Sequence, residues 1–176
     1  MQKGVLRKRP PSQLSEYGRQ LKEKQELKKH YDLREYQLRA YVGSAFSHLQ
    51  GRSQNAVETF VQNLETRLDS FVFRMGMAET RKQARQLVSH GHFLVNGKKV
   101  NIASYNVRKG NVVQARPSSL EREYFKQARL RLKKYETPSW ISLDKEKMEA
   151  SMTELPSVAE ANLGLELPLI FEYYSR

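Results

Sequence analysis

The chain has 176 residues, of which 31 are Lys or Arg and 19 are Asp or Glu, so its formal net charge is +12. A charge of this sign and size indicates a polyanionic partner, and no stretch approaches the roughly 20 consecutive apolar residues of a membrane-spanning helix, so we expect a soluble protein of one or two domains. The absence of cysteine excludes disulfide bonds and thiolate chemistry.

The charge is distributed unevenly along the chain. Residues 1–50 carry 11 basic and 5 acidic residues (net +6), residues 51–136 carry 17 and 7 (net +10), and residues 137–176 carry 3 and 7 (net −4). We therefore expect the polyanion-binding surface within the first 136 or so residues. The acidic tail is expected to fold back on the protein or to face another protein. The N-terminus has no apolar segment of the kind found in a secretory signal, which indicates the interior of a cell or an organelle.

An extended basic arm is predicted for residues 1–13. Two prolines there resist both helix and sheet, and three cations precede them: Arg7, Lys8 and Arg9. A disordered, solubilising tail is the alternative interpretation of such a run.

Two helices are predicted after the arm. The first runs from Ser15 to about Tyr31 and is unusually basic, and the second is capped by Asp32. The second helix carries apolar residues at the spacing of a core-facing stripe: Leu38, Tyr41, Val42, Ala45, Phe46 and Leu49. Residues 50–54 are expected to form a loop and the first domain boundary.

A long amphipathic helix is predicted next, begun by Asn55 with Glu58 and ended by Gly76. One face of it is apolar: Val57, Phe60, Val61, Leu64, Leu68, Phe71, Val72 and Met75. A shorter helix follows from Thr80, where Gln83 completes a capping box, to Gly91. Residues spaced four apart are expected to share its outer face with the histidine just beyond it: Arg81, Arg85, Ser89 and His92.

A hairpin completes this central module. Residues 93–95 form a short strand, Asn96 and Gly97 are the preferred pair for a two-residue type I′ turn, and residues 98–100 return. A turn at 108–111 leads to a third strand at 112–115. The sequence thus predicts a helix-turn-helix-hairpin module that closes near Pro117.

The remainder of the chain is predicted to hold a third basic helix and an irregular tail. The helix runs from about Ser119 to Tyr135, Trp140 and Ile141 anchor the irregular segment that follows, and residues 169–174 form a terminal strand. The predicted fold class is α+β, with a helical N-terminal and flanking region and an inserted module carrying a small antiparallel sheet. The predicted domains are 1–54, 55–117 and 118–176, the last packing with the N-terminal helices.

No pattern typical of an enzyme is present: the chain has no phosphate-binding glycine loop, nucleophile elbow or metalloprotease helix. The tripeptide at 67–69, Arg-Leu-Asp, resembles the catalytic motif of a class of pseudouridine synthases, but Leu68 belongs to the apolar stripe and too little chain remains for a catalytic domain. Glu65 and Asp69 are expected to form surface ion pairs with nearby arginines. His90 and His92 lack a convergent carboxylate for a metal, so no cofactor is expected.

RNA binding fits the basic and polar residues of this sequence better than an enzymatic function does. Cations can follow phosphates while neutral polar groups reach 2′-hydroxyls and exposed base edges. The predicted RNA-contacting set is Arg7, Lys8, Arg9, Tyr17, Lys22, Lys24, Lys28, Lys29, Arg81, Lys82, Arg85, Gln86, Ser89, His90, Asn96, Lys98, Lys99, Arg122, Arg129 and Arg131. A merely solvated basic face is one alternative. DNA is another on charge alone, although the short second helix lacks a base-reading Asn/Gln array.

Several runs of the sequence are characteristic of one known family. They are LSEYG at 14–18, QLKEKQ at 20–25, LETRLD at 64–69, FRMG at 73–76, TR at 80–81, ARQLVSHGH at 84–92, VNGKKVNI at 95–102, SY at 104–105, PSWI at 138–141 and FEYYSR at 171–176. Together they resemble the bacterial small-subunit ribosomal protein S-four family, and the resemblance extends over nearly the whole chain.

The resemblance implies a structural constituent of the small ribosomal subunit. Such a protein binds small-subunit rRNA at a helix junction of the 5′ domain early in assembly. It lies near the place where mRNA enters, beside the ribosomal proteins numbered five and three, and contributes to translational accuracy. A cytoplasmic ribosome is the implied location, with an organellar ribosome as the alternative. Family members often carry an N-terminal cysteine cluster that holds a metal, and because this chain has no cysteine no metal is carried over.

Overall fold

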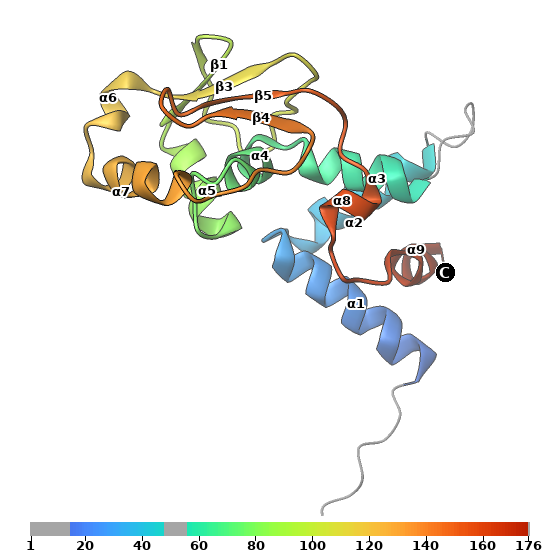
Figure 1. The fold of residues 1–176 in the computed structure, drawn as a ribbon. Helices are drawn as coiled ribbons and strands as arrows, with labels where there is room; N and C mark the ends of the chain where they lie inside the picture. The colour runs from blue at the N-terminus through green and yellow to red at the C-terminus, as the bar shows by residue number, and fades with distance from the viewer. Residues whose placement is uncertain (1–14, 48–55, 176) are drawn as a thin grey trace, which may run out of the picture.

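The computed structural model describes residues 15–47 and 56–175. In chain order the helices and strands are α1 (Glu16–His30), α2 (Glu35–Ser47), α3 (Ala56–Glu65), α4 (Leu68–Arg74), α5 (Arg81–Ser89), β1 (Phe93–Val95), β2 (Lys98–Lys99), β3 (Val112–Ala115), α6 (Pro117–Leu120), α7 (Glu123–Leu132), β4 (Ile141–Asp144), β5 (Glu149–Met152), α8 (Val158–Ala161) and α9 (Leu167–Ser175). The predicted α+β class is confirmed (Figure 1). The basic arm, the loop at 50–54, Leu49 and the Asn55 cap lie outside the described residues.

Two hydrophobic cores organise the described part of the chain. The module core lies between the sheet and helices α4, α5 and α7, and its large side chains include Phe71, Phe93, Phe125 and Trp140. The helical core joins α1, α2, α3 and α9, with Leu27, Leu38, Phe60 and Ile170 at its centre. Figure 1 shows the sheet lying above α4 and α5, with the helical core to one side.

The predicted long helix is wrong, because it is broken between α3 and α4. Arg67 takes an extended conformation (φ −60°, ψ 142°). The exposed amides at the start of α4 need acceptors, and the loop after β2 supplies them: Leu68 N–H donates to Tyr105 O (2.8 Å) and Asp69 N–H to Ala103 O (3.1 Å). The break turns the apolar stripe, so that its α3 half enters the helical core and its α4 half the module core.

The strands of the described residues form one antiparallel sheet in the order β2-β1-β3-β5-β4. The type I′ turn is confirmed by positive φ at Asn96 (49°) and Gly97 (78°). The hairpin of β4 and β5 was not predicted, because Trp140 and Ile141 were interpreted as anchors of an irregular segment. It pairs with β3, where Val113 stands opposite Ala150. Residues 118–152 therefore pack into the module core rather than against the N-terminal helices.

The predicted helix from Ser119 to Tyr135 is also divided, at Arg122, which has extended angles (φ −70°, ψ 143°). Asp32 does not cap α2. It takes a left-handed conformation (φ 51°) just after α1, and Gln37 instead accepts a hydrogen bond from the Arg34 amide (3.0 Å).

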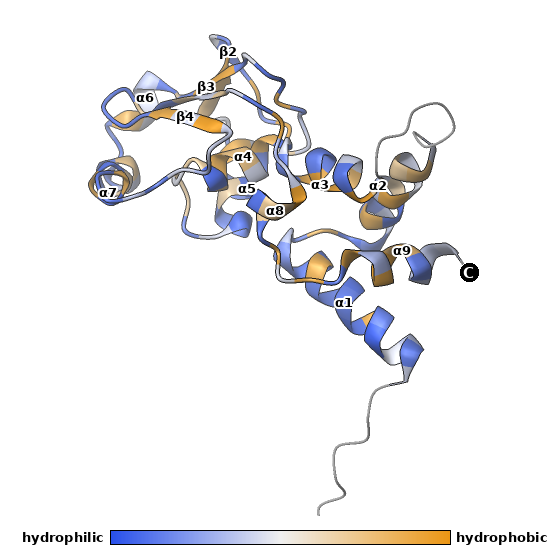
Figure 2. Ribbon diagram, turned by 45° about the vertical axis from the view of Figure 1, so that its right-hand side comes forward, coloured by the Kyte–Doolittle hydropathy of each residue, from blue (hydrophilic) through white to orange (hydrophobic). Residues whose placement is uncertain are grey.

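The predicted terminal strand is wrong as well, because residues 167–175 form helix α9. Leu167, Ile170 and Phe171 lie at helical spacing and are buried in the helical core. The ring of Phe171 contacts those of Phe46 and Phe60 (centroids 5.3 and 5.4 Å apart). In Figure 2 α9 is largely hydrophobic, whereas the neighbouring α1 is mostly hydrophilic. Helix α9 thus supplies apolar surface that α1 lacks.

Candidate RNA interface

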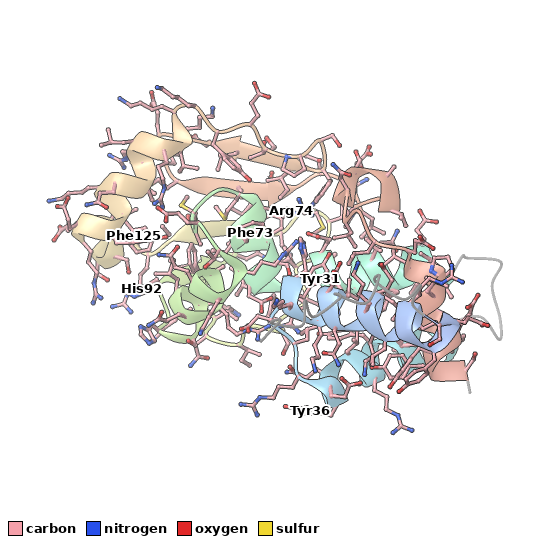
Figure 3. All side chains as sticks on the ribbon, turned by 90° about the horizontal axis from the view of Figure 1, so that it is seen from below. Tyr31, Tyr36, Phe73, Arg74, His92 and Phe125 are labelled. Atoms are coloured by element: carbon pink, nitrogen blue, oxygen red, sulfur yellow. The ribbon has the colours of Figure 1, made fainter. Side chains whose placement is uncertain are left out.

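A buried ionic cluster joins the two cores. The carboxylate of Glu65 accepts hydrogen bonds from the Tyr31 hydroxyl (2.6 Å), from Arg74 (2.8 and 2.9 Å) and from Arg81 (2.8 Å). Burial alone would raise the pKa of Glu65, but the hydrogen bonds from Arg74 and the charge of Arg81 hold it below its ordinary value. Figure 3 shows Tyr31, Phe73 and Arg74 close together beside α1. The cluster ties the end of α1 to α3, α4 and α5.

A second cluster is centred on Asp69. Its carboxylate accepts two hydrogen bonds from Arg67 (2.9 and 2.7 Å) and one from Arg85 (3.0 Å). Arg85 also pairs with the Asp32 carboxylate (3.1 Å). The prediction of ion pairs at Glu65 and Asp69 is right, but both pairs are buried rather than at the surface.

Two residues of the predicted RNA-contacting set are internal. Arg81 is only 7 % exposed, and its guanidinium carbon lies 4.2 Å from the ring centre of Tyr31 and 4.8 Å from that of Phe73. Lys24 is 4 % exposed and donates to Glu35 (2.8 Å) over the ring of Tyr173. The predicted outward placement of both side chains is wrong. Arg81 pairs with the buried Glu65, and Lys24 turns inward to pair with Glu35, whose own side chain is partly exposed. Arg85, although partly exposed, is largely committed to Asp69 and Asp32.

The rest of the predicted module residues are exposed, and several gather at the end of α5. They are Lys82, Gln86 and Ser89 on α5, His90 just after it, and Asn96, Lys98 and Lys99 on the hairpin. Lys99 lies against Gly91, where a Cβ would collide with its side chain. The hairpin therefore brings a lysine directly beside the end of α5.

His92 marks the centre of this region. It is buried, not outward as predicted, and its Nδ1 lies 2.8 Å from the Ser119 hydroxyl. Burial lowers its pKa, and the charges of Arg122, His90 and Arg116 lower it further. We call His90, Lys99, Arg116 and Arg122 the hairpin surface, because each contacts Gly91, His92 or the Ser119 that bonds His92.

Arg116 was missed by the sequence reasoning, although a signal for it existed. Strands β1 and β3 pair antiparallel with Phe93 opposite Ala115, so the residue after β3 must lie beside the residue before β1. The Arg116 amide indeed donates to His92 O (2.8 Å). Predicting the pairing of the two strands would have placed Arg116 on the hairpin surface.

The other predicted residues lie elsewhere. On α1, Tyr17, Lys22 and Lys29 are exposed, while Lys28 is half-buried and pairs with Glu35 (3.3 Å). Together with neighbouring side chains the three lysines line a groove of about 320 Å³. On α7, Arg131 pairs with Glu79, and Arg129 donates to Glu146 O (3.2 Å) beside a second groove. The structure thus brings the hairpin surface together but leaves α1 as a separate basic face. Arg7, Lys8 and Arg9 fall outside the described residues.

Among residues 15–47 and 56–175, no group of three or more His, Asp or Glu side chains is placed to hold a metal ion. No helix in the same residues is both long and apolar enough to cross a membrane.

Comparison with known proteins defines first the class of module and then the family. The model of the S4 domain matches residues 66–113, and that of the ribosomal protein S4/S9 N-terminal domain matches residues 1–65. The helix-turn-helix-hairpin is therefore an S4 RNA-binding domain.

Curated relatives match nearly the whole chain. The small ribosomal subunit protein uS4 of Herpetosiphon aurantiacus is 45 % identical over 166 residues, which cover 93 % of this chain and 77 % of the relative. The uS4 proteins of Geobacillus sp. (43 %, covering 97 % and 88 %) and Thermotoga maritima (42 %, covering 94 % and 78 %) are similar. The chain belongs to the ribosomal protein uS4 family of the small subunit, whose members are structural proteins and not enzymes. The Arg-Leu-Asp tripeptide is accordingly structural here: Asp69 is 3 % exposed and held by two arginines.

Proposed function

We propose that this protein binds small-subunit rRNA at a helix junction of the 5′ domain early in subunit assembly. Within the subunit it lies beside the ribosomal proteins numbered five and three, near the place where mRNA enters, and contributes to translational accuracy. The cytoplasmic ribosome is its proposed location. Membership of the uS4 family supports each of these statements.

The observation that carries the proposal is the hairpin surface. Three cations come from separate segments: Lys99 lies against Gly91 just after α5, and the Arg116 and Arg122 amides bond His92 O and Ser119 O beside it. Exposed neutral groups lie next to them on α5, among them Ser89 and Gln86. This combination suits RNA, because cations neutralise phosphates while hydroxyl and amide groups bond 2′-hydroxyls and base edges.

The proposed contact set consists of residues that are exposed or half-buried. From the predicted set it keeps Tyr17, Lys22, Lys28, Lys29, Lys82, Gln86, Ser89, His90, Asn96, Lys98, Lys99, Arg122 and Arg129, and it gains Arg116. Arg131 and Arg85 contribute less, because acidic partners already hold them. The arm residues Arg7, Lys8 and Arg9 remain proposed contacts with rRNA or mRNA.

Binding to a transcript of the rRNA 5′ domain tests the proposal. The protein should bind this transcript with an affinity that persists at moderate salt, and it should protect the junction from chemical probing. Equal affinity for an unrelated folded RNA of the same length, lost steeply with salt, would indicate instead that the protein binds RNA nonspecifically through its positive charge. The double variant Lys98→Ala/Lys99→Ala should bind more weakly than Lys133→Ala/Lys134→Ala, which removes the same charge from the end of α7.

The position in the subunit needs a separate experiment. The tagged protein should sediment with small subunits in stoichiometric amount, and chemical cross-linking within those subunits should join it to proteins five and three. Cross-links to other proteins alone would contradict the proposed neighbours while leaving rRNA binding intact.

A further inference from the structure

A groove separate from the hairpin surface opens beside α2. It has a volume of about 390 Å³, within the range of about 300–1,000 Å³ typical of small-ligand sites. Four short segments line it, namely α2, α3, the α3–α4 break and the loop after β2. The lining residues are Tyr36, Gln37, Ala40, Tyr41, Ser44, Asn63, Arg67 and Ser104.

Tyr36 forms one wall of the groove and has no partner in the described part of the protein. Its side chain is 63 % exposed, and among residues 15–47 and 56–175 it makes no hydrogen bond, ion pair or ring contact. Figure 3 shows it at the margin of the molecule, next to α2. An exposed aromatic ring of this kind offers a flat face on which another ring can stack.

The floor of the groove is fixed. Arg67 donates one hydrogen bond to the Tyr41 hydroxyl (2.6 Å) and two to Asp69. The loop that carries Ser104 is tied to the start of α4 by the hydrogen bonds to Ala103 O and Tyr105 O. A site held in this way requires little ordering when a ligand binds, which favours affinity.

The polar groups of the groove are neutral. The side chains of Asn63, Ser44 and Ser104 have no hydrogen-bond partner among the described residues, so their amide and hydroxyl groups are available to a ligand. Arg67 is the one charged residue in the lining, and Asp69 balances its charge. The groove therefore offers stacking and neutral hydrogen bonding, and it lacks the excess positive charge of a phosphate site.

We propose that this groove binds one unstacked nucleobase of the rRNA, with Tyr36 stacking on its face and Asn63, Ser44 and Ser104 bonding its edge. Recognition of single-stranded RNA uses this combination of an aromatic face with hydrogen bonds to base edges. The inference rests on the proposed function, because it takes the bound polymer to be rRNA. It adds a base-reading site on the helical part of the protein, away from the hairpin surface.

A tryptophan in place of Tyr36 reports on stacking directly. The natural Trp140 is buried (1 % exposed), so the Tyr36→Trp protein gains one exposed indole. Addition of the 5′-domain transcript should quench this new emission. Leu155→Trp is the matched control, because Leu155 is 53 % exposed and does not line the groove. Equal quenching in the two variants at saturating transcript, or quenching in neither, overturns the proposal.

Affinity gives an independent readout. Tyr36→Ala should bind the transcript about five- to a hundredfold more weakly, the range expected for one lost base stack, whereas Tyr36→Phe should bind as the natural protein does. Wild-type affinity in Tyr36→Ala sinks the nucleobase site but leaves rRNA binding in place. If the natural protein itself fails to bind the transcript, the proposed function fails, and this inference fails with it. A change in Tyr36→Trp emission only when protein five is added would assign the groove to a protein and overturn the RNA site.

Discussion

The carboxylate of Glu65 lies 2.8 Å from Nη2 of Arg81, and both residues are buried: Glu65 completely, and Arg81 with 7 % of its surface exposed. Arg74 and Tyr31 still hold Glu65 when Arg81 is removed, so the cost is the loss of one buried hydrogen bond between charged groups, about 1.5–3 kcal/mol. We therefore expect Arg81→Ala to lower the free energy of unfolding by this amount, as measured by urea denaturation. The exposed pair of Lys22 and Glu26 (3.9 Å) provides a control: Glu26→Gln should cost less than about 1 kcal/mol. Similar losses in the two variants would contradict the structural role of Arg81.

The stability of the fold should also depend on pH, through ionisation of the Glu35 carboxyl group. Burial opposes ionisation of this carboxyl, but hydrogen bonds from Lys24, Tyr174 and Lys28 outweigh it and lower its pKa to about 2. Because the folded-state pKa is depressed, the stabilisation is complete above the ordinary value of 4.5 and is lost as the pH falls from there towards about 2.

The variant Glu35→Gln isolates this contribution. Its urea midpoint should lie below that of the natural protein at pH 6, and the two should converge as the pH approaches 2.5. A constant difference between them over this range would show that ionisation of Glu35 does not stabilise the fold.

Local signals made several features of the fold predictable. The Ser15 hydroxyl accepts from the Gly18 amide (3.2 Å) at the start of α1, and the Thr80 hydroxyl accepts from the Gln83 amide (3.1 Å) at the start of α5. The Asn96–Gly97 turn is equally local. In each case the residues that determine the structure lie within a few positions of one another, so a single sequence contains the whole interaction.

The errors have non-local causes. No glycine or proline marks the break at Arg67, because the groups that stabilise it belong to residues 103–107. Helical spacing indicated that Arg81 and Arg85 share a face, but the face turns inward because the acceptor Glu65 lies on another helix. Residues 169–174 have the aromatic and branched composition of a strand, and only packing against α1 and α2 makes them helical.

The candidate site also divides into residues that local signals identify and residues that only the tertiary structure brings together. Charge and turn chemistry were enough to identify the hairpin lysines, whereas Arg116 required the pairing of β1 with β3. The groove beside α2 was beyond sequence reasoning, since its lining residues come from segments up to 68 positions apart, from Tyr36 to Ser104.

The glycine at position 91 should be essential to the hairpin surface. It has a positive φ (73°), and a Cβ there would strike the Lys99 side chain. Gly97 has a similar φ (78°) but open space around it. We expect Gly97→Ala to cost about 1–2 kcal/mol through backbone strain alone. Gly91→Ala should incur the same strain and in addition displace Lys99. It should therefore bind RNA more weakly than Gly97→Ala does. Thermal unfolding and transcript affinity, measured on both variants, check this; equal affinities would contradict the close packing of Lys99 on Gly91.

The salt dependence of binding should identify Arg116 as a phosphate contact. Each phosphate neutralised by a protein cation contributes about 0.7 to 0.9 to the slope of log affinity against log salt concentration. Arg116→Ala should therefore weaken binding to the 5′-domain transcript and reduce that slope by about this amount, without changing which RNA is preferred. Lys134→Ala removes the same charge from an exposed position just after α7. Lys134 lies outside the proposed contact set, so this variant should leave the slope unaltered. An unchanged slope in Arg116→Ala would remove this arginine from the interface, and an equal change in both variants would show that the slope reports only net charge.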